Sequence, residues 1–148
     1  MQRKTLTSDA KALVATCAAW NSRLAARRIS QFLDRAVEEC GLSGAQLGLM
    51  AQIAAADDDT LGALARRSGL DQSTLSRNLR TLEAEGLVEI AAVENELRRR
   101  AVWLTETGAR RLEAAVPLWR SAHHKLAKIL NADLALRLAK GTELLVES

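Results

Sequence analysis

Residues 60–82 constrain the fold most, because they read as two short helices joined by a glycine turn. Three apolar side chains share one face of the first helix, namely Leu61, Leu64 and Ala65. Gly69 then supplies the turn, and Asp71 stands where the N-cap of the next helix is expected. The second helix repeats an apolar residue at helical spacing: Leu75, Leu79 and Leu82. This order of elements is typical of a helix-turn-helix.

The opposite face of the second helix is polar and cationic. Its predicted outward residues are Ser73, Arg77 and Arg80, flanked by Gln72, Thr74 and Ser76. Arginine can form two hydrogen bonds with guanine, and hydroxyl groups can reach bases or phosphates. We therefore expect the helix over residues 72–85 to bind double-stranded DNA in the major groove.

A β-hairpin is predicted after this helix. Gly86 should end the helix, residues 87–90 read as one strand, and residues 101–104 read as its partner. The tip between the two strands is expected to hold residues 96–100, Glu-Leu-Arg-Arg-Arg. Three consecutive cations beside a recognition helix predict DNA contacts by the hairpin: Arg98, Arg99 and Arg100.

These residues together resemble the MarR family of bacterial transcriptional regulators. The resemblance extends over nearly the whole chain and is most specific in residues 61–88 and in the helix restart at residues 104–108. The family usually carries an Asp-x-Arg motif in the wing, where the aspartate holds an arginine that enters the minor groove. The resemblance implies that Arg98, in the wing 91–100, enters the minor groove and that Glu96, longer than the usual aspartate, braces it.

The segments on either side of the predicted winged helix, residues 43–104, are helical by pattern. The first carries an apolar stripe through Leu13, Cys17, Trp20 and Leu24 that continues to Gly41. A long helix is expected from a Thr105 cap to about residue 130, with a bend or break at Pro117. A last helix is expected over about residues 133–146, weakened by Gly141.

The apolar faces of these terminal helices are too wide for one small winged helix to cover. The resemblance implies that residues 5–40 and 108–147 of two subunits interlock into a homodimer. The whole chain, residues 1–148, is then one domain of mainly α class with a small β-hairpin wing. Its length and its 48% hydrophobic content suit one domain with a core of its own.

The apolar run at residues 12–20 is too short and too closely preceded by Asp9 and Lys11 to predict a secretion signal. No run reaches the roughly 18 to 20 apolar residues that a membrane span needs. We therefore expect a cytoplasmic protein without a membrane partner. The net charge of +3 is only mildly basic, so DNA affinity would depend on where the cations lie.

Trp20 and Trp119 are candidate contacts for a small aromatic ligand of the kind that the family binds, although packing in a core is the commoner role of tryptophan. Cys17 stands roughly where one branch of the family senses hydroperoxides. That branch also uses tyrosines, which this chain lacks, and helix packing is the alternative role for Cys17 and Cys40. His123 and His124 are adjacent, so on a helix they point about 100° apart and cannot form the pair of metal ligands that lies four residues apart on one face. No metal site and no cofactor are expected.

The sequence thus predicts a dimeric DNA-binding transcriptional regulator, a repressor of a pseudo-palindromic operator that a small, phenolic ligand releases. Two alternatives stay open: a thiol-based redox-sensing regulator acting through Cys17, and a winged-helix module for protein contacts. No motif combines a nucleophile, a base and an orienting group, and no phosphate loop is present, so we do not expect an enzyme.

Overall fold

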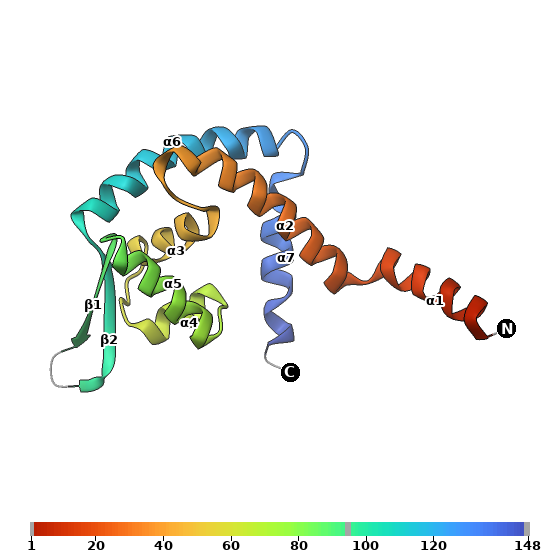
Figure 1. The fold of residues 1–148 in the computed structure, drawn as a ribbon, viewed down its shortest axis with the longest axis horizontal. Helices are drawn as coiled ribbons and strands as arrows, with labels where there is room; N and C mark the ends of the chain where they lie inside the picture. Colours follow the sequence, from red (N-terminus) through yellow and green to blue (C-terminus); the bar gives the residue numbers. More distant parts are fainter. Residues whose placement is uncertain (1, 94–95, 147–148) are drawn as a thin grey trace.

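The computed structural model describes residues 2–93 and 96–146 (Figure 1), and it leaves out the side chains of Gln2, Val93, residues 96–98 and Ala132. The elements follow in this order: α1 (Gln2–Thr16), α2 (Ala18–Val37), the 3-10 turn η1 (Glu38–Cys40), α3 (Gly44–Ala54), α4 (Leu61–Ser68), α5 (Gln72–Ala84), β1 (Val88–Val93), β2 (Glu96–Leu104), α6 (Glu106–Leu126), α7 (Ala132–Gly141) and the 3-10 turn η2 (Glu143–Leu145). This mainly α architecture with one antiparallel hairpin confirms the predicted fold class.

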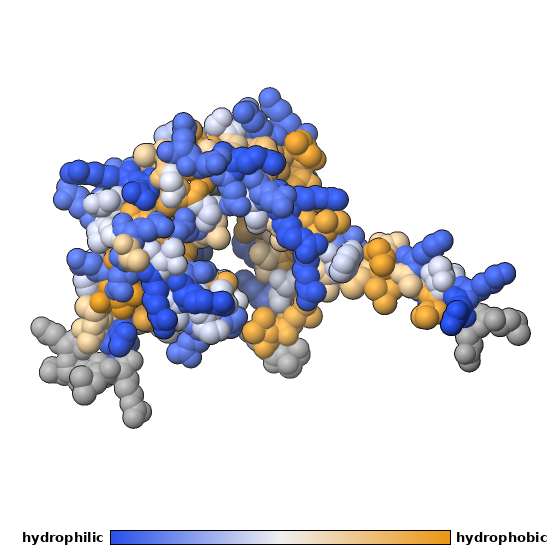
Figure 2. All heavy atoms as spheres, in the orientation of Figure 1, coloured by the Kyte–Doolittle hydropathy of each residue, from blue (hydrophilic) through white to orange (hydrophobic). Residues whose placement is uncertain are grey.

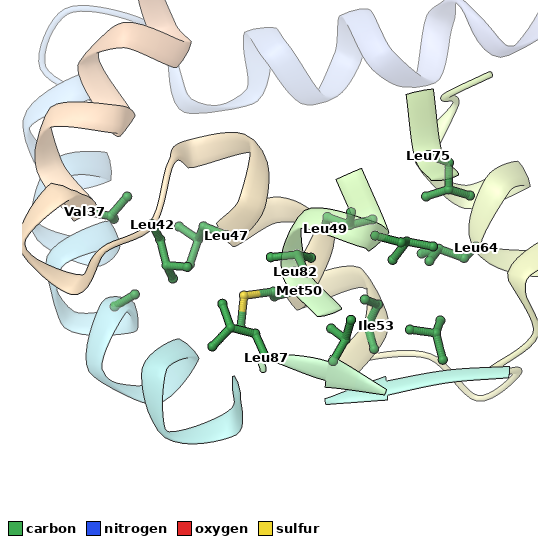
Figure 3. Packing of buried hydrophobic residues seen from close by; sticks show 14 residues of the cluster. Val37, Leu42, Leu47, Leu49, Met50, Ile53, Leu64, Leu75, Leu82 and Leu87 are labelled. Atoms are coloured by element: carbon green, nitrogen blue, oxygen red, sulfur yellow. The ribbon is translucent and has the colours of Figure 1, made fainter. Parts of the chain in front are cut away.

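The core lies where α3 meets α4, α5 and the base of the hairpin (Figure 3). Met50 of α3 and Leu64 of α4 are completely buried. The leucines that were predicted to face inward from α5 are buried as well: Leu75, Leu79 and Leu82. Burying an apolar side chain of this size contributes about 1.5–3 kcal/mol, so this cluster fixes the orientation of α5 and of its polar face.

Side-chain caps and left-handed glycines set the limits of the helix-turn-helix. The Thr60 hydroxyl accepts a hydrogen bond from the Ala63 amide, and the Asp71 carboxylate accepts one from the Thr74 amide. Gly69 lies at φ 65° after α4, and Gly86 lies at φ 73° after α5. Glycine adopts positive φ without steric cost, so the predicted cap and both predicted turns are confirmed.

The hairpin is longer than the sequence predicted. Its strands pair in antiparallel register from Val88 opposite Leu104 to Ala92 opposite Arg100, where an irregularity follows. Residues 96–100 therefore belong to β2, and the prediction that they form the tip was wrong. The apolar pattern marked only the half-buried base of the hairpin, whereas backbone pairing continues between solvent-exposed residues because it does not depend on side-chain polarity.

The loop before α4 is attached to the second strand of the hairpin. Thr60 forms an isolated antiparallel bridge with Ala101, and the Val102 amide donates a hydrogen bond of 2.9 Å to the carbonyl oxygen of Asp59. The hairpin is thus held against the helix-turn-helix through its own backbone.

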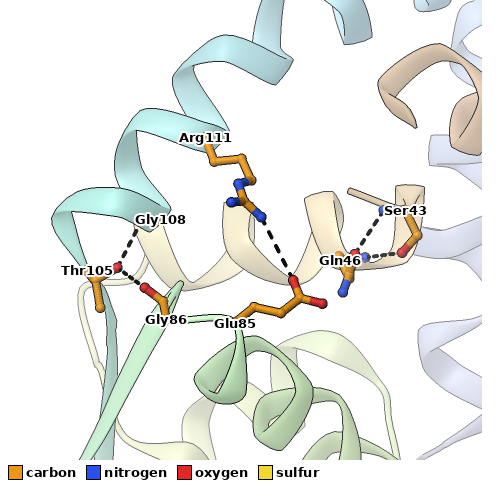
Figure 4. Close-up of polar contacts among 7 residues, drawn as sticks. All are labelled: Ser43, Gln46, Glu85, Gly86, Thr105, Gly108 and Arg111. Carbon is orange, nitrogen blue, oxygen red and sulfur yellow. Dashed lines mark hydrogen bonds and ion pairs between the residues drawn. The ribbon is translucent and has the colours of Figure 1, made fainter. Parts of the chain in front are cut away.

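A network of short contacts joins the end of α5 to the start of α6 (Figure 4). The Thr105 hydroxyl donates to the carbonyl oxygen of Gly86 at 2.6 Å and accepts from the Gly108 amide at 3.0 Å. The Thr105 amide donates to the carbonyl oxygen of Leu87 at 3.1 Å. A Cβ on Gly108 would overlap this carbonyl group, so only glycine fits at that position.

The predicted N-terminal helical stripe is divided in two. The helix ends at Thr16, and Cys17 takes an extended conformation with φ −64° and ψ 115° before α2 begins. The Asn21 amide group donates to the carbonyl oxygens of Val14 and Cys17, at 3.3 and 2.9 Å, and so links α1 to α2 across the break. Figure 1 shows α1 projecting away from the rest of the molecule.

The C-terminal helices also differ from the prediction. α6 passes through Pro117 as one helix, so the predicted break is absent, and it ends at Leu126 rather than near residue 130. Proline removes one backbone hydrogen bond, and the packing of α6 against α2 and α3 holds the helix across this position. The last helix ends at Gly141, the predicted weak point, and the 3-10 turn η2 follows it.

Apolar side chains are exposed on both terminal helices (Figure 2). On α1, Leu13 is 61% exposed, and on α7, Leu138 is 50% exposed. Within the described part of the chain, no helix combines the length and the apolar character that crossing a bilayer requires.

We predict that Gly108→Ala destabilises the protein by more than about 2 kcal/mol, because the new methyl group would push β1 away from α6. Urea denaturation followed by circular dichroism measures this change. Gly48→Ala in α3 is the matched control: its Cβ would meet no atom within 4 Å, so it should leave the protein equally stable or stabilise it by up to about 1 kcal/mol. Equal midpoints for Gly108→Ala and the wild type would contradict the proposed close approach.

Candidate nucleic-acid interface

The solvent-facing side of α5 carries the side chains that the sequence selected. Gln72, Ser73, Arg77 and Arg80 are exposed, and Thr74 and Ser76 are half-buried beside them. Their orientation follows from the three buried leucines of the same helix, because residues three and four positions apart share a face. The helix therefore presents hydroxyl, amide and guanidinium groups along one exposed surface.

Asp71 organises the first turn of this helix. Its carboxylate accepts hydrogen bonds from the Thr74 amide at 2.8 Å, from the Ser73 hydroxyl at 2.7 Å and from the Thr74 hydroxyl at 2.9 Å. These bonds, led by that of the Thr74 amide, lower the pKa of Asp71 to about 2. The carboxylate is ionised at neutral pH, so both hydroxyl protons are directed to it, and their oxygens remain available to accept hydrogen bonds.

A groove of about 990 Å³ lies between α4, α5 and the hairpin. Its apolar lining comes from all three: Leu61, Ala65, Leu75, Leu79 and Ile90. Four arginines also line it: Arg66, Arg80, Arg99 and Arg100. Two acids among the described residues, Asp58 and Glu83, line it as well. Within this described lining arginines outnumber acids, which favours an anionic occupant.

Arg66 is the lining cation that the sequence analysis missed. It follows Gly62 by one helical turn on α4, and its Nη1 would lie 3.8 Å from a Cβ at that position. The signal was present, because Arg66 lies outside the apolar face of Leu61, Leu64 and Ala65. Its proximity to the hairpin, however, depends on tertiary packing.

Asp58 lies at the same groove and is fixed by local hydrogen bonds. Its Oδ1 accepts from the Thr60 amide at 3.0 Å, and its carbonyl oxygen accepts from Arg67 Nη1 at 3.2 Å. The bonds with Thr60 hold the pKa of Asp58 below its usual value, and the nearby charges of Arg99 and Arg66 lower it further. The loop before α4 thus carries an ionised carboxylate beside the cations of the groove.

The hairpin contributes Arg99 and Arg100, which are both exposed on β2. The backbone of residues 96–98 also belongs to β2, but the side chains of Glu96 and Arg98 lie outside the described residues. The predicted brace between them therefore stays a prediction. The described arginines already place cations of the hairpin and of α5 along one groove.

The remaining candidates lie away from this surface. Trp20 is 49% exposed on α2, and Trp119 is 37% exposed on α6, where its ring centroid lies 4.4 Å from that of His123. Neither tryptophan lines the groove beside α5 or a smaller groove of about 300 Å³ between α3 and α5. Cys17 is half-buried at the break before α2 and carries a free thiol. Among the residues with described positions, no group of three metal-ligating side chains is present.

Comparison with known proteins agrees with this arrangement. A model of the MarR family matches residues 41–100, from the start of the core to the second strand of the hairpin. A search of curated proteins finds no match to the chain. The structure is similar to that of the Mycobacterium tuberculosis transcriptional regulator MosR in complex with DNA, with 32% identity, a TM-score of 0.77, and coverage of 86% of this chain and 92% of MosR.

Two further solved structures show the same fold. A second crystal structure of Mycobacterium tuberculosis MosR has 32% identity and a TM-score of 0.73, and the match covers 90% of this chain and 96% of MosR. A variant of Escherichia coli MarR complexed with operator DNA has 23% identity and a TM-score of 0.75, with 90% of this chain and 96% of MarR covered. The matching family model, the identity to MosR over most of both chains and the shared fold place this chain in the MarR family of transcriptional regulators.

Proposed function

We propose that the protein is a dimeric repressor that binds double-stranded DNA, with the helix 72–85 in the major groove and the wing 91–100 in the minor groove. The observation that carries this proposal is the exposed polar side of α5, with Arg77 and Arg80, beside the hairpin arginines Arg99 and Arg100. Guanidinium groups on a helix suit base edges and phosphates, and a cationic hairpin suits the adjacent groove.

The DNA complexes of two relatives support the same reading. MosR, which shares 32% identity with this chain, was crystallised with DNA, and MarR was crystallised with operator DNA. The helix and the hairpin of this chain belong to the segment that the family model matches. We therefore assign DNA recognition to these two elements rather than to the terminal helices.

A winged-helix module for protein contacts fits the residues less well. Protein interfaces concentrate aromatic and aliphatic side chains at their centre. The exposed side of α5 has none of these, and carries serine, glutamine and arginine instead. DNA is the better match for this chemistry.

A redox switch through a disulfide between Cys17 and Cys40 of one chain also has little support. Cys17 and Cys40 lie at opposite ends of α2, whose 20 residues span roughly 30 Å at about 1.5 Å per residue. A disulfide requires Cα atoms within about 7 Å, so these two thiols of one chain cannot pair without unfolding the helix. A ligand-responsive regulator therefore remains our proposal, with a small aromatic, phenolic molecule as the releasing ligand and Trp20 and Trp119 as its candidate contacts.

Two features of this chain favour a dimer. The exposed leucines of α1 and α7 require a covering surface, and a single recognition helix reads too few base pairs to be specific in a genome. Interlocked terminal helices from residues 5–40 and 108–147 of two subunits would cover the leucines. Two-fold symmetry would then place two copies of α5 about one helical turn apart on a pseudo-palindromic operator, roughly 10 base pairs between half-site centres.

We expect Arg77→Ala to weaken binding to an operator selected from random duplexes by about 1–3 kcal/mol, as for the loss of a base or phosphate contact. Fluorescence anisotropy with a labelled duplex measures the affinity. Arg77→Lys is the matched control, because it keeps the charge but loses the forked guanidinium. If Arg77 binds guanine, the lysine variant loses discrimination at one base pair; wild-type affinity in Arg77→Ala would show that this face of α5 is misassigned.

The wing generates a separate prediction. Arg98→Ala should lower affinity for the selected operator and for unrelated duplexes alike, and it should make the dependence of affinity on salt concentration shallower, because a minor-groove cation neutralises phosphates. Titrations at several salt concentrations measure both effects. A loss confined to one operator sequence, with an unchanged salt dependence, would instead indicate major-groove base reading by the hairpin.

The dimer is tested by size-exclusion chromatography with light scattering. The wild type should show twice the chain mass of 16.1 kDa at micromolar concentration. Leu134→Lys combined with Leu138→Lys should give the monomer mass and lower operator affinity by about 100-fold or more, since one half-site is lost. Lys140→Ala, a truncation on the same helix but away from the face of these two leucines, should leave the dimer intact. A wild-type monomer, or a footprint over one half-site only, would contradict the architecture.

A further inference from the structure

Three of the arginines that line the groove between α4, α5 and the hairpin form no close ion pair within the described residues. Within residues 2–93 and 96–146, the guanidinium groups of Arg66, Arg80 and Arg100 make neither a hydrogen bond nor an ion pair. All three are exposed and line the same groove as Arg99. Among the described lining residues, four arginines face only two acids, so the groove favours an external anion that passes along it.

The geometry of DNA identifies such an anion. The major and minor grooves of one duplex are separated by a sugar–phosphate strand on each side. If α5 lies in the major groove and the wing lies in the minor groove, one strand must cross the surface between them. That surface is the groove, which α5 borders with Gln72, Ser76 and Arg80 and the hairpin borders with Arg99 and Arg100.

We propose that this groove holds the sugar–phosphate strand between the two DNA grooves, and that Arg66 of α4 is a phosphate contact on its far side. The inference rests on the proposed function and extends it in two ways. It adds a DNA-contacting residue outside the recognition helix and the wing. It also assigns Arg80 and Arg100 to the backbone rather than to base edges, so that Arg77 is the arginine of α5 left for base reading.

Arg66 and Arg67 are neighbours on α4, but only Arg66 lines the groove. Arg66 lines the groove and its guanidinium lies back along the helix near Gly62. Arg67 does not line the groove, and its Nη1 donates to the carbonyl oxygen of Asp58. The two side chains have the same charge and lie in the same last turn of α4. Arg67 is therefore a matched control for the position of the charge.

The two acidic side chains described in the groove, Asp58 and Glu83, differ in how they would affect a phosphate strand there. The Asp58 carboxylate accepts a hydrogen bond from the Thr60 amide. Arg66 and Arg99, whose charges lower the pKa of Asp58, line the groove beside it. Asp58 can therefore hold the guanidinium groups of Arg66 and Arg99 toward the groove. Glu83 lines the groove near the C-terminal end of α5, three residues after Arg80.

The test measures duplex affinity of the dimeric full-length chain over a range of KCl concentrations, for the selected operator and for an unrelated duplex. Each lost phosphate contact should reduce the slope of log affinity against log salt by about 0.9. Arg66→Ala should therefore reduce the slope by about 0.9 for each half-site, and by the same amount on both duplexes. Arg66→Lys should restore most of the slope, and Arg67→Ala should keep the wild-type slope.

A second measurement locates the phosphate. Uncharged methylphosphonate groups are placed one at a time along each strand of the selected operator. One position between the helix-contacted and wing-contacted base pairs should weaken the wild type and leave Arg66→Ala without a further loss. Wild-type binding with an unchanged slope in Arg66→Ala, or a loss that depends on base sequence, overturns this inference alone. Failure of the wild type to bind any duplex overturns the proposed function with it.

Discussion

The close approach of Gly108 to Leu87 is the constraint on which the arrangement of α5, the hairpin and α6 depends. It lets the first turn of α6 lie against the backbone at the start of β1, where the Thr105 hydroxyl bonds to both Gly86 and Gly108. The end of α5, the start of the hairpin and the start of α6 thus meet at one point. A side chain at position 108 would separate them, because a backbone carbonyl cannot move aside as a flexible side chain can.

This contact between Leu87, Thr105 and Gly108 connects the helix-turn-helix and the hairpin to α6 and, through α6, to α2. α6 packs against α2, and the same helix begins at the hairpin. Arg111 of α6 also lies 4.0 Å from Glu85, the C-cap residue of α5 (Figure 4). Both side chains are partly exposed, so this ion pair adds little stability by itself. Its position nevertheless adds a third contact between α6 and the end of α5, beside those made by Thr105 and Gly108.

The hairpin is positioned from a second side by the loop before α4. The backbone contacts of Asp59 and Thr60 with β2 hold the wing beside the first helix of the helix-turn-helix. A groove with four lining arginines results from this three-sided arrangement of α4, α5 and hairpin. The mild net charge of +3 is therefore a poor guide to the local charge, because these arginines are gathered at one place.

The sequence by itself determined the elements whose cause is local. Asp71 and Thr105 cap their helices, Gly69 and Gly86 end theirs, and the leucine spacing of α5 sets which face is buried. These features depend on hydrogen bonds and backbone angles within a few residues, so the pattern of residues was sufficient to predict them.

Only the tertiary structure decided the features that depend on distant partners. It ended α1 before Cys17, kept α6 continuous at Pro117 and extended the hairpin through Arg100. It also placed Arg66 on the groove with Arg99, which are 33 positions apart in the chain by their residue numbers. Packing and cross-strand pairing join residues that are remote along the chain. The energy of those contacts therefore cannot be predicted from any short stretch of sequence.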